Sequence, residues 1–137
     1  RNVPGGRVGV ALTAVRLGAS PGRAQASAQV KPVFDHLIPN ADGKKLVAVV
    51  VTYPPGVKSA AHHHARSAFI YAYVLSGAIR SQVGNEPAKV YATGESWVEA
   101  PGAYHRVSEN ASSTEPAKLL AVFVANTGEA LTRPDPQ

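Results

Sequence analysis

The sequence predicts an all-β fold, and three observations lead to that prediction. Short stretches rich in valine and aromatic residues recur along the chain, turn residues separate them, and no stretch shows a convincing helical period. The chain has 137 residues, which is the length of one domain with a single core. Short strands at such regular spacing indicate a β-sandwich or a β-barrel.

Seven segments are expected to form strands. Valine and aromatic side chains favour the pleated backbone, and pairs such as Pro-Gly, Ser-Gly and Thr-Gly favour the turns that end each segment. In chain order the seven are Lys45–Tyr53, Phe69–Leu75, Ala78–Val83, Lys89–Ala92, Ser96–Glu99, His105–Ser108 and Lys118–Ala125.

Three parts are expected along the chain: residues 1–31 as an N-terminal arm or targeting remnant, 32–131 as a barrel domain, and 132–137 as a loose tail. The apolar run 8–15 follows Arg7, and Ala24-Gln25-Ala26 resembles a small-residue cleavage site. Arg16 interrupts that run, so a packed arm stays an alternative. The compartment is therefore left open between cytoplasmic and periplasmic or secreted. No apolar stretch is long enough to predict a membrane span.

The net charge of +5 does not indicate a nucleic-acid-binding surface. Residues 1–31 contain five basic residues and no acidic one, whereas basic and acidic residues are equal in number from residue 32 onward. A neutral barrel offers no electrostatic footprint for a phosphate backbone, so nucleic acid is not an expected partner. The chain has no cysteine, so any metal site must use histidine or carboxylate ligands.

Three of the five histidines are consecutive, at positions 62 to 64. Side chains alternate between the two faces of an extended strand, so His62 and His64 point the same way and His63 points the other way. Two imidazoles on one face can converge on one metal ion. By itself such a pair is more often a surface cluster. A further histidine, His105, follows a Pro-Gly turn on a later predicted strand.

These elements resemble the two motifs of the cupin superfamily. In the first motif a glycine, five residues and His-x-His match Gly56, His62 and His64, and the closing glycine matches Gly77. In the second, two glycines eight residues apart and a histidine three further on match Gly94, Gly102 and His105. The resemblance covers residues 45–125 and implies a jelly-roll β-barrel. It also implies that His62, His64 and His105 bind one divalent metal ion, while the motif glycines lie in turns.

The match departs from the family pattern at the carboxylate. Cupins commonly supply a glutamate between the second histidine and the closing glycine. Its equivalent is Ile70 when counted back from Gly77, and Ala68 or Phe69 when counted forward from His64. None of these can bind a metal, so a three-histidine centre is expected. Glu99 lies near the second motif as a potential acid or base, although strand alternation can also aim it outward.

Further side chains are candidates for a pocket beside the metal, because apolar and aromatic residues commonly line small-molecule sites. An arginine and a glutamine on the strand after Gly77 could also reach the centre. The pocket candidates are Ile70, Tyr71, Gln82, Trp97, Tyr104 and Phe123.

A three-histidine centre suits several chemistries. Fe, Mn, Ni, Zn and Cu all accept imidazole, so the metal is not identified. Without a carboxylate the centre would favour a small anionic or chelating ligand and either Lewis-acid or oxygen-activating chemistry, as in a dioxygenase-like or a lyase- or isomerase-like enzyme. The alternative is a non-catalytic ligand-binding or sensor cupin with a structural metal. The resemblance further implies a homodimer.

Overall fold

The computed structural model describes residues 26–134, and within this range the protein consists of ten strands and no helix. No helix in that range is therefore long and apolar enough to cross a membrane. The strands are β1 (Gln29–Leu37), β2 (Lys44–Tyr53), β3 (His62–His64), β4 (Phe69–Ser76), β5 (Ala78–Val83), β6 (Lys89–Ala92), β7 (Ser96–Glu99), β8 (Tyr104–Asn110), β9 (Ala117–Asn126) and β10 (Thr132–Pro134).

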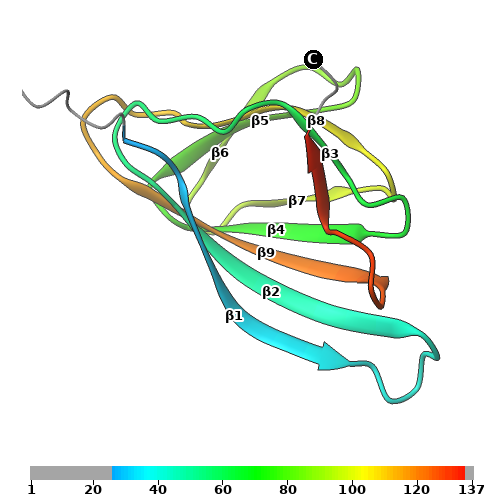
Figure 1. The fold of residues 1–137 in the computed structure, drawn as a ribbon. Helices are drawn as coiled ribbons and strands as arrows, with labels where there is room; N and C mark the ends of the chain where they lie inside the picture. Colours follow the sequence, from blue (N-terminus) through cyan, green and yellow to red (C-terminus); the bar gives the residue numbers. More distant parts are fainter. Residues whose placement is uncertain (1–25, 135–137) are drawn as a thin grey trace, which may run out of the picture.

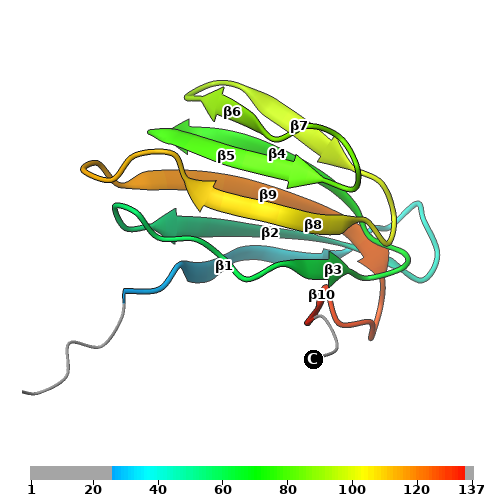
Figure 2. The ribbon, with the colours of Figure 1, turned by 90° about the horizontal axis from the view of Figure 1, so that it is seen from above.

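The strands form two five-stranded antiparallel sheets, which Figure 1 shows as two layers. One sheet has the order β1-β2-β9-β4-β7 and the other the order β10-β3-β8-β5-β6. From β2 onward the chain passes repeatedly from one sheet to the other, as Figure 2 shows from above. This is the jelly-roll arrangement, so the predicted all-β fold is confirmed.

The core lies between the two sheets and follows the alternation of strand side chains. In β9, every second residue from Ala117 to Ala125 is buried, and the residues between them are more exposed. Ile70 and Val74 of β4 and Ile79 of β5 are the largest side chains that are completely buried. Burial of one such side chain contributes about 1.5–3 kcal/mol, so this layer holds the two sheets together.

Turns at the motif glycines close the strands, and Gly77 shows why no other residue fits there. Its φ of +70° lies in the left-handed region, and a Cβ atom built on it would lie 2.6 Å from the carbonyl oxygen of Pro116. Gly102, between the end of β7 and the start of β8, also has a positive φ of +72°. The two glycines therefore allow the tight turns that carry the chain from one sheet to the other, from β4 to β5 and from β7 to β8.

All seven predicted strands are present; β3 was expected only as an extended stretch at the consecutive histidines, and β1 and β10 were not predicted. β1 begins at Gln29, before the expected start of the barrel at residue 32, and Thr132–Pro134 of the expected tail pairs with β3. Residues 1–25 and 135–137 lie outside the described range. The arm or targeting remnant and the boundaries of the three parts therefore stay predictions.

Candidate metal centre

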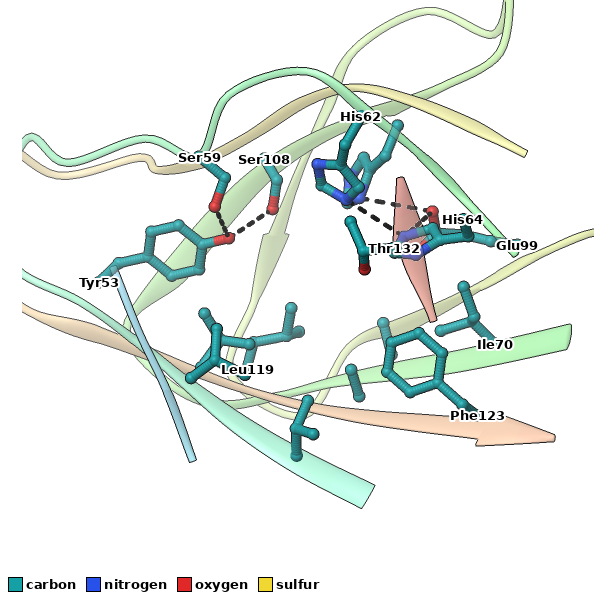
Figure 3. Close-up of a pocket in the computed structure, with 16 residues that line it drawn as sticks. Tyr53, Ser59, His62, His64, Ile70, Glu99, Ser108, Leu119, Phe123 and Thr132 are labelled. Carbon is teal, nitrogen blue, oxygen red and sulfur yellow. Dashed lines mark hydrogen bonds and ion pairs between the residues drawn. The ribbon is translucent and has the colours of Figure 1, made fainter. Parts of the chain in front are cut away.

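The three motif histidines meet on the inner face of the second sheet. β3 lies between β10 and β8, and its pairing places His62 directly opposite His105. His64 lies two residues along β3 from His62 and therefore shares its face. One nitrogen from each of the three rings lies within 4.8 Å of the other two (Figure 3). The two motifs thus form one cluster, although they are 41 residues apart in the sequence, at His64 and His105.

Hydrogen bonds on the outer nitrogens orient the three rings. His62 Nδ1 lies 2.8 Å from the carbonyl oxygen of Ala60, and His64 Nδ1 lies 3.3 Å from that of Leu131. A carbonyl oxygen can only accept, so in the neutral rings Nδ1 donates and Nε2 keeps its lone pair. His105 Nε2 lies 2.9 Å from Ser81 Oγ, which leaves Nδ1 of that ring for the cluster. Such outer partners are typical of metal-binding histidines.

The spacing of the inner atoms fits a divalent ion. His62 Nε2 and His64 Nε2 lie 3.3 Å apart, although both carry lone pairs in these tautomers. On a tetrahedral ion with metal–nitrogen bonds of about 2.1 Å, neighbouring ligand atoms lie about 3.4 Å apart. A cation between two neutral imidazoles would be bound by both of these lone pairs. The arrangement therefore suits a metal ion.

Glu99 also points into this cluster. In β7, Trp97 and Glu99 are buried while Ser96 and Val98 are exposed, so Glu99 faces inward. Its Oε1 lies 3.4 Å from His64 Nε2 and 3.4 Å from His105 Nδ1. From the sequence, the direction of the Glu99 side chain is open. Trp97 is a large apolar residue that is expected to face inward, and residues two apart on a strand share a face. This alternation could have indicated that Glu99 faces inward too.

The charges in this cluster influence one another. Burial alone would raise the pKa of Glu99, but contact with His64 and the positive charge that His105 and His64 can carry outweigh burial and lower this pKa. Burial lowers the pKa of His105 from 6.5 to about 4; Glu99 opposes this shift, and His62 and His64 add to it. Near pH 7 the cluster is therefore a carboxylate beside a neutral His105, and both groups are in the form that binds metals.

A cavity of about 230 Å³ lies between the two sheets next to the histidines. Ile70 and Phe123, two of the predicted pocket residues, line it together with apolar residues of β2 and β9. A hydroxyl cluster lies on the side away from the histidines (Figure 3). In that cluster, Tyr53 Oη lies 2.9 Å from Ser59 Oγ and 2.8 Å from Ser108 Oγ. No motif in the sequence indicates these three hydroxyl groups, because they come from separate parts of the chain.

The other four predicted pocket residues do not line this cavity. Tyr71 is 41% exposed on the other face of β4, and Gln82 donates a hydrogen bond to a carbonyl group in the turn after β5. Trp97 lines a neighbouring cavity, with its ring 6.3 Å from that of His105. Tyr104 stacks on His63 with 4.5 Å between ring centroids. His63 therefore lies outside the cluster, on the face that alternation predicted.

Comparison with solved structures gives similar folds. A conserved protein with a double-stranded β-helix domain from Klebsiella pneumoniae is 22% identical, and the match covers 80% of this chain and 88% of that one with a TM-score of 0.62. A cupin-2 domain from Rhodospirillum rubrum is 14% identical, with 80% and 66% covered and a TM-score of 0.59. A recombinant oxalate oxidase in complex with glycolate is 21% identical, with 63% and 45% covered and a TM-score of 0.54.

At these identities the similarities show the fold alone. No curated protein sequence matches the chain. The family described as Cupin domain, Cupin_2, matches residues 49–123, which is more than half of the chain and includes all three clustered histidines. The chain therefore belongs to the cupin family.

Proposed function

We propose that the protein binds one divalent transition metal ion through His62, His64 and His105 and uses it to bind and transform a small organic ligand. The convergence of three ring nitrogens at the wall of a cavity is the observation that carries this proposal. When bound, an ion such as Fe, Mn, Ni, Zn or Cu would supply Lewis-acid or oxygen-activating chemistry.

The cavity indicates the class of ligand. Its walls between the histidines and the hydroxyl cluster are apolar, with Val49, Val51 and Leu119 among them. These side chains exclude water and accept a short apolar body. An anionic or chelating oxygen group, such as an enolate or a carboxylate, would occupy the histidine end, where a metal ion makes negative charge favourable.

The hydroxyl cluster supports a second polar contact for the ligand. Tyr53 is 2% exposed and Ser108 is 4% exposed, and Figure 3 shows their oxygen atoms to the left of His62. Three hydroxyl groups hold three protons, and the two hydrogen bonds among them use two. One proton is therefore left to donate to a ligand, so a polar group at the far end of the ligand would be bound there.

Catalysis and binding without turnover are both compatible with this site. The structural neighbours include an oxalate oxidase crystallised with glycolate, a small oxygen ligand, which supports the enzyme as the first candidate. A sensor or binding cupin with a structural metal is the alternative, and fold alone does not choose between them. Turnover of a chelating substrate by the metal-loaded protein would establish the enzyme, and ligand binding without turnover would establish the alternative.

Metal content tests the first step. Elemental analysis of the native protein is expected to find one metal ion per chain, and His62→Ala, His64→Ala or His105→Ala is expected to remove most of it. His63→Ala is the matched control, because its ring stacks on Tyr104 outside the cluster. Equal loss of metal from His63→Ala would contradict the assignment.

Ligand binding tests the second step. Oxygen uptake and product formation are measured with a panel of carboxylates, enolates and 1,3-dicarbonyls on metal-loaded protein. Tyr53→Phe is expected to lower the affinity for ligands that carry a distal polar group by about tenfold, because one hydrogen bond to a buried partner is lost. The metal content should be unchanged. If wild type and Tyr53→Phe bind every ligand with equal affinity, the hydroxyl cluster is not part of the ligand site.

A further inference from the structure

Ile70 and Glu99 occupy equivalent places on neighbouring strands. The antiparallel pairing of β4 with β7 sets Ile70 directly opposite Glu99. Ile70 is 1% exposed and Glu99 2%, and both line the cavity beside the histidines. Directly opposite residues of an antiparallel pair point to the same side with Cβ atoms about 5 Å apart. A carboxylate on position 99 therefore reaches the space that a carboxylate on position 70 would reach.

Position 70 is where counting back from Gly77 places the glutamate that cupins commonly use. From this relationship we propose that Glu99 replaces that glutamate from the neighbouring strand and is the fourth ligand of the metal centre. The inference rests on the proposed function, because it requires that the histidines bind a metal. It changes the expected centre from three imidazoles to three imidazoles and one carboxylate.

The surroundings of Glu99 Oε1 support a ligand role. This oxygen is buried and, among the described residues, accepts no hydrogen bond. A buried carboxylate oxygen without a partner is costly, and a cation next to it removes the cost. The two nitrogens nearest to it, His64 Nε2 and His105 Nδ1, are the inner nitrogens whose lone pairs face the cluster. The carboxylate oxygen and these two nitrogens thus surround one position, and each of the three atoms is of a type that binds metal ions.

Three of the separations among these four atoms are those expected around a shared ion. Oε1 lies 3.4 Å from each of the two nitrogens, and His62 Nε2 lies 3.3 Å from His64 Nε2. These values agree with the separation of about 3.4 Å between neighbouring ligand atoms on a tetrahedral ion. Glu99 is therefore placed to bind the ion directly, together with the imidazoles, and not only to support the imidazoles from outside.

A carboxylate ligand also changes the charge of the centre. Three neutral imidazoles would leave a divalent ion with its full charge, whereas Glu99 reduces the total to one positive charge. A single anionic oxygen group on the ligand then neutralises the centre. The inference therefore narrows the ligand class to molecules with one negative charge at the metal-binding end.

The test measures Zn²⁺ affinity by calorimetry on wild type, Glu99→Gln, and the double variant Ile70→Glu/Glu99→Ile, which moves the carboxylate back to β4. Glu99→Gln is expected to weaken Zn²⁺ binding by about tenfold or more, and the exchanged pair to recover most of that loss. Glu95→Gln is the matched control, because Glu95 is exposed on the turn before β7 and should leave the affinity unchanged.

Each outcome has one meaning. An affinity of Glu99→Gln within about twofold of wild type overturns the inference, since a lost ligand costs at least as much as a lost outer partner. If Glu99→Gln is weak and the folded exchange variant is equally weak, Glu99 positions the histidines and is not a ligand, which also overturns it. If wild type binds Zn²⁺ no better than His62→Ala, the proposed function itself fails. Should Glu99→Gln not fold, the exchange variant alone decides, because it buries the same two side chains.

Discussion

Ser81 of β5 and His105 of β8 are joined by a buried hydrogen bond of 2.9 Å between the serine Oγ and the imidazole Nε2. The strand register places the two residues on adjacent strands of one sheet, and both are less than 5% exposed. This bond fixes which nitrogen of His105 faces the cluster. The serine thereby orients a metal-binding ring without touching the metal.

Ser81→Ala is expected to weaken metal binding by about 10- to 100-fold, because the His105 ring loses the partner that fixes its orientation. Calorimetric titration with Zn²⁺ measures this. Ser108→Ala is the matched control: Ser108 is equally buried but bonds Tyr53 in the hydroxyl cluster. A loss of the same size in Ser108→Ala would show a general effect of packing and not of ring orientation.

The metal-free protein is expected to lose stability as the pH falls from about 6.5 to about 4. The pKa of His105 is about 4 in the folded chain and 6.5 in the absence of the fold, so between these values the unfolded chain binds more protons. For one proton the slope is at most about 1.4 kcal/mol per pH unit. The pKa of Glu99 is also lowered by folding, so the stability that its ionised form contributes is likewise lost as the pH falls.

Thermal unfolding of metal-free wild type and His105→Asn between pH 7.5 and 4.5 measures this effect. The variant lacks the group with the lowered pKa, so its melting temperature should depend less on pH across that window. Parallel curves for the two proteins would show that His105 does not contribute to the pH dependence.

We predict that the protein forms a homodimer through β1. All nine residues of this edge strand are exposed, and four of them are large apolar residues: Val30, Val33, Phe34 and Leu37, exposed by 50–63%. An apolar strand at the edge of a sheet is costly in water unless a partner covers it. Light scattering is expected to give the mass of a dimer for wild type and of a monomer for Val33→Glu/Phe34→Glu. A monomeric wild type would contradict the prediction.

Much of the fold could be predicted because its signals are local. The seven valine-rich or aromatic segments became strands at nearly the predicted bounds, and alternation within β3 correctly separated His63 from its two neighbours. β1 lacked such a signal: all its residues are exposed, so no alternation between buried and exposed positions marks it. β10 has three residues and depends on pairing with β3, which a local pattern cannot show.

The site was harder to predict, because its remaining parts depend on pairing between strands. Glu99 enters the cluster through the register of β7 against β4, and Ser81 through that of β5 against β8. The hydroxyl cluster joins Tyr53 of β2 with Ser108 of β8 across the two sheets. Tyr104 and Trp97 were expected at the pocket because they are aromatic and near the second motif. Their faces and the extent of the cavity are tertiary properties.

Asn110, at the end of β8, is expected to be among the residues that contribute most to stability outside the core. Its side-chain Nδ2 lies within hydrogen-bond distance of the carbonyl oxygens of Tyr53, Pro54 and Glu115, and its Oδ1 accepts from the amide of Ser112. The side chain thus ties the end of β2 to the loop before β9. Asn110→Ala would leave these buried groups without partners, at a cost of roughly 2–4 kcal/mol.

Denaturant unfolding of Asn110→Ala and wild type measures this loss, and Asn85→Ala is the control. Asn85 is exposed and accepts one hydrogen bond from Arg106, so its removal should cost about 0.5 kcal/mol or less. Because Tyr53 belongs to the hydroxyl cluster, Asn110→Ala should also weaken binding of ligands with a distal polar group. The histidines lie on the other side of the cavity, so Zn²⁺ affinity should be unchanged in the folded variant. If Asn110→Ala loses Zn²⁺ affinity as well as stability, the two ends of the cavity are structurally coupled and do not depend on separate contacts.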